Sequence, residues 1–217
     1  MSIRGTGINK IAFIQQIVGS NKMRNMKFLR EMARKRANLV VKLKRNQYIT
    51  EFLDHEITKD IKAGPRSESG NSSGALGSSK GNLYSFIGFQ QGMDPTGAIR
   101  DGIEQGCRLK SSTFRARSTF RGKTFSQWSI EYDMAYPTVD DLKRLKEADM
   151  PWEGGSWIDK VEKNISGLGA YFFARSGFVK SKSGNAIQLR QDFQSVKFKR
   201  TDYFTGIIRR VFGKAKL

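Results

Sequence analysis

The fold is decided by residues 21–61, which read NKMRNMKFLREMARKRANLVVKLKRNQYITEFLDHEITKDI. Neither proline nor glycine interrupts this stretch. Its apolar residues recur at spacings near three and four, at Met26, Leu29, Ala33, Ala37, Val40, Ile49, Phe52, Leu53 and Ile57. This period is typical of an amphipathic helix with one face turned toward a core. We therefore predict one long helix over 21–61, ended by Gly64 and Pro65.

An antiparallel sheet is predicted to cover the apolar face of this helix. Residues 123–134 alternate apolar and polar side chains, as a half-buried strand does. Residues 110–120 also have β propensity, and Arg121 and Gly122 between the two runs favour a hairpin. Further strands are predicted over 170–174 and 186–198. The expected fold is a single α+β domain over 1–217, with the long N-terminal helix packed on a mainly antiparallel sheet and short additional helices.

Shorter segments complete the expected architecture. We predict a short entry segment at 1–20, an aromatic-rich strand at 82–89 and a short helix over 96–109. Two helices are predicted to begin with a capping box, one at Thr138 with Asp141 and one, over 157–166, at Ser156 with Asp159. An amphipathic helix over 202–213 is followed by a basic tail to 217. Residues 64–81 are rich in glycine and serine, so we predict a flexible loop that only a neighbouring molecule orders.

Positive charge is the main anomaly of the composition. The 217 residues contain 39 Lys and Arg against 20 Asp and Glu, a formal net charge of +19. Such an excess points to a polyanionic neighbour: nucleic acid, a membrane surface or an acidic protein. The first half of the long helix carries much of it, and Glu31 is the only acid there. The candidate contact residues on this helix are Arg30, Arg34, Lys35, Lys42 and Arg45. Their face either is simply solvated or contacts an acidic partner or the path of DNA.

A second basic cluster lies on the predicted hairpin. Arg115, Arg117 and Arg121 alternate with phenylalanines, and no acid occurs between 105 and 130. Cations interleaved with aromatic rings suit contact with a nucleic-acid backbone together with base stacking. Alternatively, the phenylalanines face the core of the sheet and the arginines face solvent. Any contact with DNA through such residues would be electrostatic and independent of sequence.

Residues for catalysis are scarce. The chain has one histidine, His55, and one cysteine, Cys107, which together cannot build a Cys/His zinc site. We expect His55 to be a surface residue and Cys107 to be a buried or incidental thiol. Asp140 and Asp141 open a helix, where carboxylates favour the positive end of its dipole. The sequence therefore predicts a protein that is not an enzyme and uses no cofactor or metal. It has no run long and apolar enough for a signal peptide or a membrane span, so we expect a soluble chain made in the cytoplasm.

The order of these features resembles the tail-completion, or head–tail joining, proteins of the neck of tailed bacteriophages. The resemblance is carried by the opening SIRGTGI, the long basic helix ending in DIKAGPRSESGNSSGAL, the Arg/Lys-rich strands, PWEGGSWIDKVEKN and the late SKSGNAIQ. The passage after the helix is similar to that family's A-x-x-P…(T/S)-G-x-L pattern. The segment GNLYSFIGFQQGMDP looks like part of a virion protein of large tailed phages. The chain is longer than small members of the family, with insertions around 82–109.

The resemblance implies a structural protein of the virion, assembled in the host cytoplasm. Such proteins form rings, with a hexamer expected and a dodecamer as the alternative, between the connector and the tail. The implied partners are further copies of the chain, neighbouring proteins of the connector, tail terminator, sheath or tube, and DNA passing through the channel. Two other classes remain open: a nucleic-acid-binding protein without sequence preference, and a component of the tail tube or baseplate.

Overall fold

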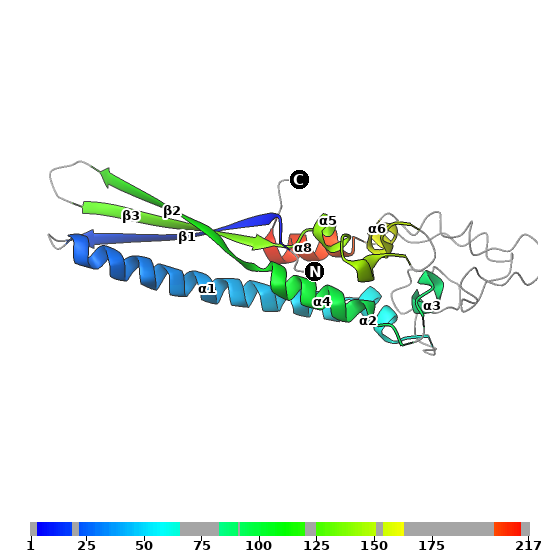
Figure 1. The fold of residues 1–217 in the computed structure, drawn as a ribbon. Coiled ribbons are helices and arrows are strands. Elements are labelled where there is room, and N and C mark those ends of the chain that lie inside the picture. Colours follow the sequence, from blue (N-terminus) through cyan, green and yellow to red (C-terminus); the bar gives the residue numbers. More distant parts are fainter. Residues whose placement is uncertain are drawn as a thin grey trace, which may run out of the picture.

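The computed structural model describes residues 4–18, 22–65, 83–90, 92–119, 125–150, 154–162 and 202–213. For 13–18, 22–26, 86, 114–119 and 125–129 it describes the backbone alone. The elements are β1 (Gly7–Val18), α1 (Lys22–Asp54), α2 (Glu56–Lys62), α3 (Leu83–Ile87), α4 (Pro95–Gly106), β2 (Arg108–Thr119), β3 (Phe125–Tyr136), α5 (Val139–Leu142), the 3-10 turn η1 (Lys146–Ala148), α6 (Trp157–Glu162) and α8 (Phe204–Phe212). The fold is α+β: a long helix, a three-stranded antiparallel sheet and several short helices, as the sequence predicts (Figure 1).

The three strands form one sheet in the order β1-β3-β2, with both pairs antiparallel. β3 is central, and its alternation sets the two faces. Ile130, Tyr132 and Met134 are buried, whereas Glu131 and Asp133 between them are half-buried. The predicted hairpin and the predicted inward face of its second strand are therefore confirmed for the residues whose side chains are described. Figure 1 shows α1 running alongside this sheet, while the short helices gather toward the end where α1 finishes.

The entry segment is a full strand, which the sequence did not predict. β1 pairs with β3 along its whole length, from Gly7 opposite Tyr136 to Val18 opposite Phe125. Its partner β3 lies more than a hundred residues away in the sequence. The sequence around β1 therefore does not show which segment it pairs with.

The predicted single helix over 21–61 is wrong at one point. His55 has an extended backbone (φ −64°, ψ 133°) and separates α1 from α2. Its Nδ1 accepts a hydrogen bond from the Ile57 amide at 3.3 Å, so His55 caps α2. Its ring also lies 4.7 Å from that of Tyr203, centroid to centroid, which leaves it half-buried rather than simply on the surface. The bend brings both Phe52 and Ile57 into the core.

The predicted strand over 82–89 is also wrong, because Leu83–Ile87 form the short helix α3. Leu83, Tyr84 and Ile87 are all buried, and offsets of one and four residues place them on one side of a helix. The aromatic content of this segment reflects burial instead of β structure. Phe89, just after the helix, packs edge-on against Trp157 with ring centroids 5.8 Å apart.

Other predicted helices are confirmed with small shifts at their ends. Asp94 caps α4 by accepting from the amides of Thr96 and Gly97, both at 3.0 Å. Ser156 Oγ accepts from the Ile158 amide at 3.2 Å at the start of α6. Asp159 forms an ion pair with Lys143 at 3.1 Å. Residues 66–81 of the predicted loop over 64–81 lie outside the described residues. So do the predicted strands over 170–174 and 186–198, the end of the helix predicted over 157–166 and the basic tail.

An aromatic cluster joins α8 to the C-terminal half of α1. Phe52, Trp157, Tyr203 and Phe204 are all fully buried. The rings of Phe52 and Phe204 stack with centroids 5.4 Å apart, and Tyr203 lies 4.3 Å from Phe204. These contacts bury large apolar areas and add the favourable geometry of aromatic pairs. They confirm the predicted amphipathic helix, here α8, as part of the core.

Side chains from distant parts of the chain hold the end of α8. Lys44 Nζ donates to the Val211 carbonyl at 2.5 Å, and Asn9 Nδ2 donates to the Phe212 carbonyl at 3.1 Å. The last carbonyls of a helix have no partner within it, and a cation there also favours the dipole. The ring of Phe212 stacks on that of Tyr136 at 4.0 Å. α8 is thereby fixed to α1, β1 and β3.

Asp141 fixes the start of β1 to the start of α5. Its Oδ2 accepts from the amide and the hydroxyl of Thr6, both at 2.8 Å. It also accepts from the amide and the hydroxyl of Thr138, both at 2.9 Å, which completes the predicted capping box. Burial raises the pKa of Asp141, but the hydrogen bonds from Thr138 and Thr6 outweigh it, so the pKa lies below the ordinary value of 3.8.

We predict that Asp141→Ala lowers the free energy of unfolding by about 2 kcal/mol, because a cap is removed and four donors lose their acceptor. Since the pKa of Asp141 is lowered by folding, its ionised form stabilises the fold above pH 3.8, and this contribution is lost as the pH falls further. Urea unfolding at neutral pH and near pH 3 measures both effects. Asp140→Ala is the matched control, because its side chain is 75% exposed, and should cost less than about 0.5 kcal/mol. Equal costs for the two variants would contradict the role assigned to Asp141.

Candidate functional site

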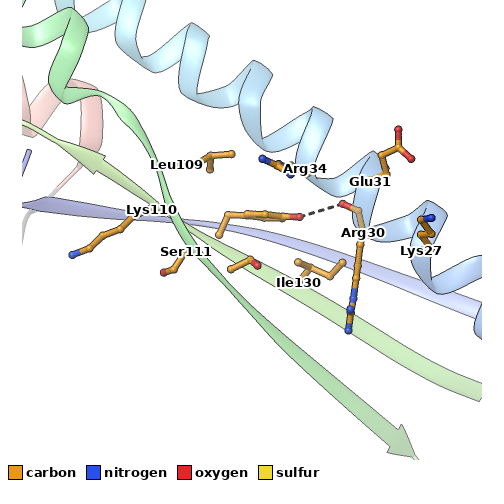
Figure 2. Close-up of a pocket in the computed structure, with 10 residues that line it drawn as sticks. Lys27, Arg30, Glu31, Arg34, Leu109, Lys110, Ser111 and Ile130 are labelled. Carbon is orange, nitrogen blue, oxygen red and sulfur yellow. Dashed lines mark hydrogen bonds between the residues drawn. The ribbon is translucent and has the colours of Figure 1, made fainter. Parts of the chain in front are cut away.

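A cleft of about 660 Å³ lies between α1 and the β2–β3 hairpin (Figure 2). Its lining residues are Lys27, Arg30, Glu31 and Arg34 from α1, Leu109, Lys110, Ser111 and Ser112 from β2, and Ile130 and Tyr132 from β3. Four of the ten are cations and three carry hydroxyl groups. The cleft therefore combines positive charge, neutral hydrogen-bonding groups and an apolar floor.

Beside the cleft, α1 packs against the sheet through small side chains. Ala33, Ala37 and Val41 are buried, and such small side chains let the helix lie close to the sheet. Arg30 and Arg34 are exposed and line the cleft on the same side of the helix. β2 also has an irregular register between Leu109 and Ser111, at the edge of this site. Bulges of this kind redirect side chains and often lie beside functional sites.

A hydrogen bond crosses the cleft. The Tyr132 hydroxyl donates to the main-chain carbonyl of Arg30 at 3.2 Å, drawn as a dashed line in Figure 2. Burial raises the pKa of Tyr132, and the charges of Arg34 and Arg30 act in the opposite direction. The tyrosine therefore stays a neutral hydroxyl at physiological pH. It holds the helix at a fixed distance from β3.

The charge of the cleft is poorly compensated. Glu31 is the only acid among the ten described residues of its lining, and Figure 2 shows its carboxylate pointing away from the sheet. That carboxylate forms an ion pair with Lys35 at 3.1 Å. In the described part of the chain, no acid forms an ion pair with Lys27, Arg34 or Lys110. Several cations that share one cleft attract a ligand with repeated negative charge, such as a phosphate backbone.

The five predicted contact residues of the long helix do not share one face. Arg30 and Arg34 line the cleft. Lys35 and Lys42 are exposed but do not line it, because they lie about 100° and about 80° around the helix from Arg34, on the side away from the sheet. The predicted continuous basic face is thus divided between two sides of α1.

Arg45 has a different environment from the other four. It is half-buried, and its Nε atom is buried without a hydrogen-bond partner among the described residues. Its charge acts on Cys107, whose thiol is buried. Burial raises the pKa of Cys107 to about 12, with Arg45 acting against the shift, so the thiol is protonated at neutral pH. Arg45 therefore belongs to the interior of the fold, and Cys107 is the inert buried thiol that the sequence predicts.

The arginines predicted on the hairpin are only partly located. Arg115 pairs with Ser129 and Arg117 with Gln127 in the sheet register, while their side chains, and Arg121 altogether, lie outside the described residues. Sequence reasoning missed Ser111, Ser112 and Tyr132 as parts of the cleft. The alternation of β3 predicts that Tyr132 faces inward. The sequence does not show the rotation of α1 about its axis that places Arg30 beside Tyr132.

Two absences hold for the described residues. No group of three or more His, Cys, Asp or Glu side chains there is placed to hold a metal ion. No helix in those segments combines the length and the apolar character that crossing a bilayer requires.

Comparison with known proteins gives no match to this chain among protein-family models, curated proteins or solved structures.

Proposed function

We propose that this chain is a structural, non-catalytic protein of a tailed-phage virion, a neck or tail-completion subunit that forms a ring and joins the head connector to the tail. The observation that carries the proposal is the cationic cleft beside α1, on a chain of net charge +19. A subunit beside the path of packaged DNA needs such a surface. The resemblance of the sequence to neck proteins supports the same assignment.

The energetics of the cleft fit a passing polyanion better than a small ligand. Exposed ion pairs contribute only about 0–1 kcal/mol each. Lys27, Arg30, Arg34 and Lys110 act together, so their sum is enough to position a phosphate backbone without holding it tightly. Salt screens interactions of this kind over roughly 8–10 Å. Weak, non-specific contacts also allow DNA to move through a channel.

The joining of heads to tails tests the proposal. In cells infected by phage that lack this chain, we expect DNA-filled heads and separate tails. Adding purified wild-type protein to such a lysate should restore infectious particles. The variant with Arg30→Glu and Arg34→Glu should restore at least about tenfold fewer, because the cleft becomes nearly neutral.

The matched control carries the same change in charge elsewhere. Arg144 and Lys146 are exposed and lie outside the cleft, so Arg144→Glu with Lys146→Glu should restore particles like the wild type. Circular dichroism and the unfolding midpoint should be unchanged in both double variants. Normal particles formed without the chain would disprove the neck assignment, and equal rescue by the two double variants would disprove the role of the cleft.

A nucleic-acid-binding protein without sequence preference is the second candidate, and the same cleft favours it. The two candidates differ in oligomeric state. A neck subunit should form rings in negative-stain images or occur at fixed copy number in virions. A binding protein should sediment as a monomer, and its affinity for DNA should fall steeply as salt rises.

A further inference from the structure

The outer side of α1 carries a line of exposed apolar side chains, which we call the outer stripe. It consists of Phe28 (61% exposed), Met32 (38%), Leu39 (61%) and Leu43 (69%). At about 100° per residue, the four fall within an arc of about 60° that extends roughly 22 Å along the helix. The side of α1 that faces the sheet carries Ala33, Ala37, Val41 and Tyr48, all buried. The helix is thus apolar on two opposite sides, and the sheet covers one of them.

The outer stripe is as large as the apolar surface patches that often have a function. At roughly 180 Å² for each large apolar side chain, it exposes on the order of 400 Å² of apolar surface in one line. Contiguous patches of this size on a soluble protein mark interaction sites. The offsets of four, seven and four residues between its members are those along which one helix packs against another. The shape of the surface therefore fits a helix.

The charges beside the outer stripe indicate what kind of helix would bind there. Lys35 and Lys42 flank it on one side and Arg36 on the other, all exposed. We propose that the outer stripe binds an acidic amphipathic helix of a partner protein. Its apolar side chains would cover Phe28, Leu39 and Leu43, and its flanking carboxylates would meet the lysines and the arginine. This surface is separate from the cleft and does not depend on the proposed function.

A second copy of this chain fits the outer stripe less well. Two stripes packed on each other would bury about 800 Å² in total, as would a partner helix of equal apolar area, so the buried area does not distinguish the two occupants. The same packing would bring the cations of the two copies together: Lys35, Arg36 and Lys42 have the same sign in both. Like charges across an interface oppose association. An acidic partner replaces this repulsion with attraction.

The test uses the full chain and two synthetic helical peptides. Each peptide has about four heptads with leucine at the a and d positions, and they differ only in glutamate or lysine at e and g. Fluorescence anisotropy measures their binding. The glutamate peptide should bind at least about tenfold more tightly than the lysine peptide, and its binding should weaken severalfold from about 50 to 500 mM salt.

Variants of the protein locate the site. Leu39→Ser with Leu43→Ser should weaken binding of the glutamate peptide at least about tenfold without lowering the unfolding midpoint, because both side chains are exposed. Ile8→Ser with Met93→Ser is the matched control, since these residues are 41% and 37% exposed and lie off the outer stripe; it should bind like the wild type. Equal binding of the two peptides, no binding at about 100 µM, or no effect of the leucine variant would overturn the proposal. A wild-type dimer in sedimentation that is lost in the leucine variant would also overturn the proposal, because a second copy of the chain would then occupy the outer stripe.

Discussion

Phe204→Ala is expected to lower the free energy of unfolding by about 3–5 kcal/mol, the range for removing a large aromatic side chain from a core. Phe204 is fully buried, stacks on Phe52 at 5.4 Å and contacts Tyr203 at 4.3 Å. Alanine would leave a cavity between α8 and α1, lined by rings too large to move into it. The loss is a large part of the roughly 5–15 kcal/mol by which a domain is stable.

Phe28→Ala is the matched control, because it is the same substitution at a side chain that is 61% exposed. It should change stability by less than about 0.5 kcal/mol. Since Phe204→Ala can prevent folding altogether, Phe204→Leu provides a milder variant that keeps most of the volume and should cost about 1–1.5 kcal/mol. Chemical denaturation followed by tryptophan fluorescence measures all three. Similar losses for Phe28→Ala and Phe204→Ala would show that α8 does not belong to the core.

The second large effect is expected from Gly5→Ala. A Cβ atom on Gly5 would lie 2.4 Å from the carbonyl carbon of Tyr136, 2.6 Å from its oxygen and 2.8 Å from the carbonyl oxygen of Gly106. All three are main-chain atoms, so no side chain can rotate to make room. Either the segment that leads into β1 or the ends of α4 and β3 must shift, and we expect a loss of about 3 kcal/mol.

Gly154→Ala is the control for Gly5→Ala, because a Cβ there meets no atom within 4 Å. It should be neutral or slightly stabilising, since alanine restricts the unfolded chain. Thermal unfolding of both variants measures the difference. If Gly5→Ala unfolds at the temperature of the wild type, the close approach of β1 to Tyr136 described here is wrong.

The elements that the sequence predicts well are those whose pattern is local. The long helix, the hairpin of β2 and β3, and α8 each carry a period that a core imposes on one face. The break at His55 was missed because its ring packs against Tyr203, which is distant in sequence. The helical form of α3 was missed because its aromatic content also suits β structure. β1 was missed because its partner β3 is distant in sequence.

The candidate site was predictable only in part. The excess of lysine and arginine on α1 is plain in the sequence, but its division into two sides is not. α1 is apolar on both its inner and its outer side, so hydrophobic periodicity alone does not show which cations face the sheet. Arg30 and Arg34 line the cleft, whereas Lys35 and Lys42 flank the outer stripe. Only the position of the sheet separates the two pairs.

The attachment of α8 has a consequence for synthesis of the protein. The Asn9 side chain bonds to the Phe212 carbonyl, a contact between residues 203 positions apart. On the ribosome, β1 and α1 therefore emerge long before the helix that completes their packing. Contacts between residues so far apart in the sequence slow folding, and chains whose synthesis is incomplete expose apolar surface. Until α8 is synthesised, the parts of α1 and β1 that contact it remain uncovered.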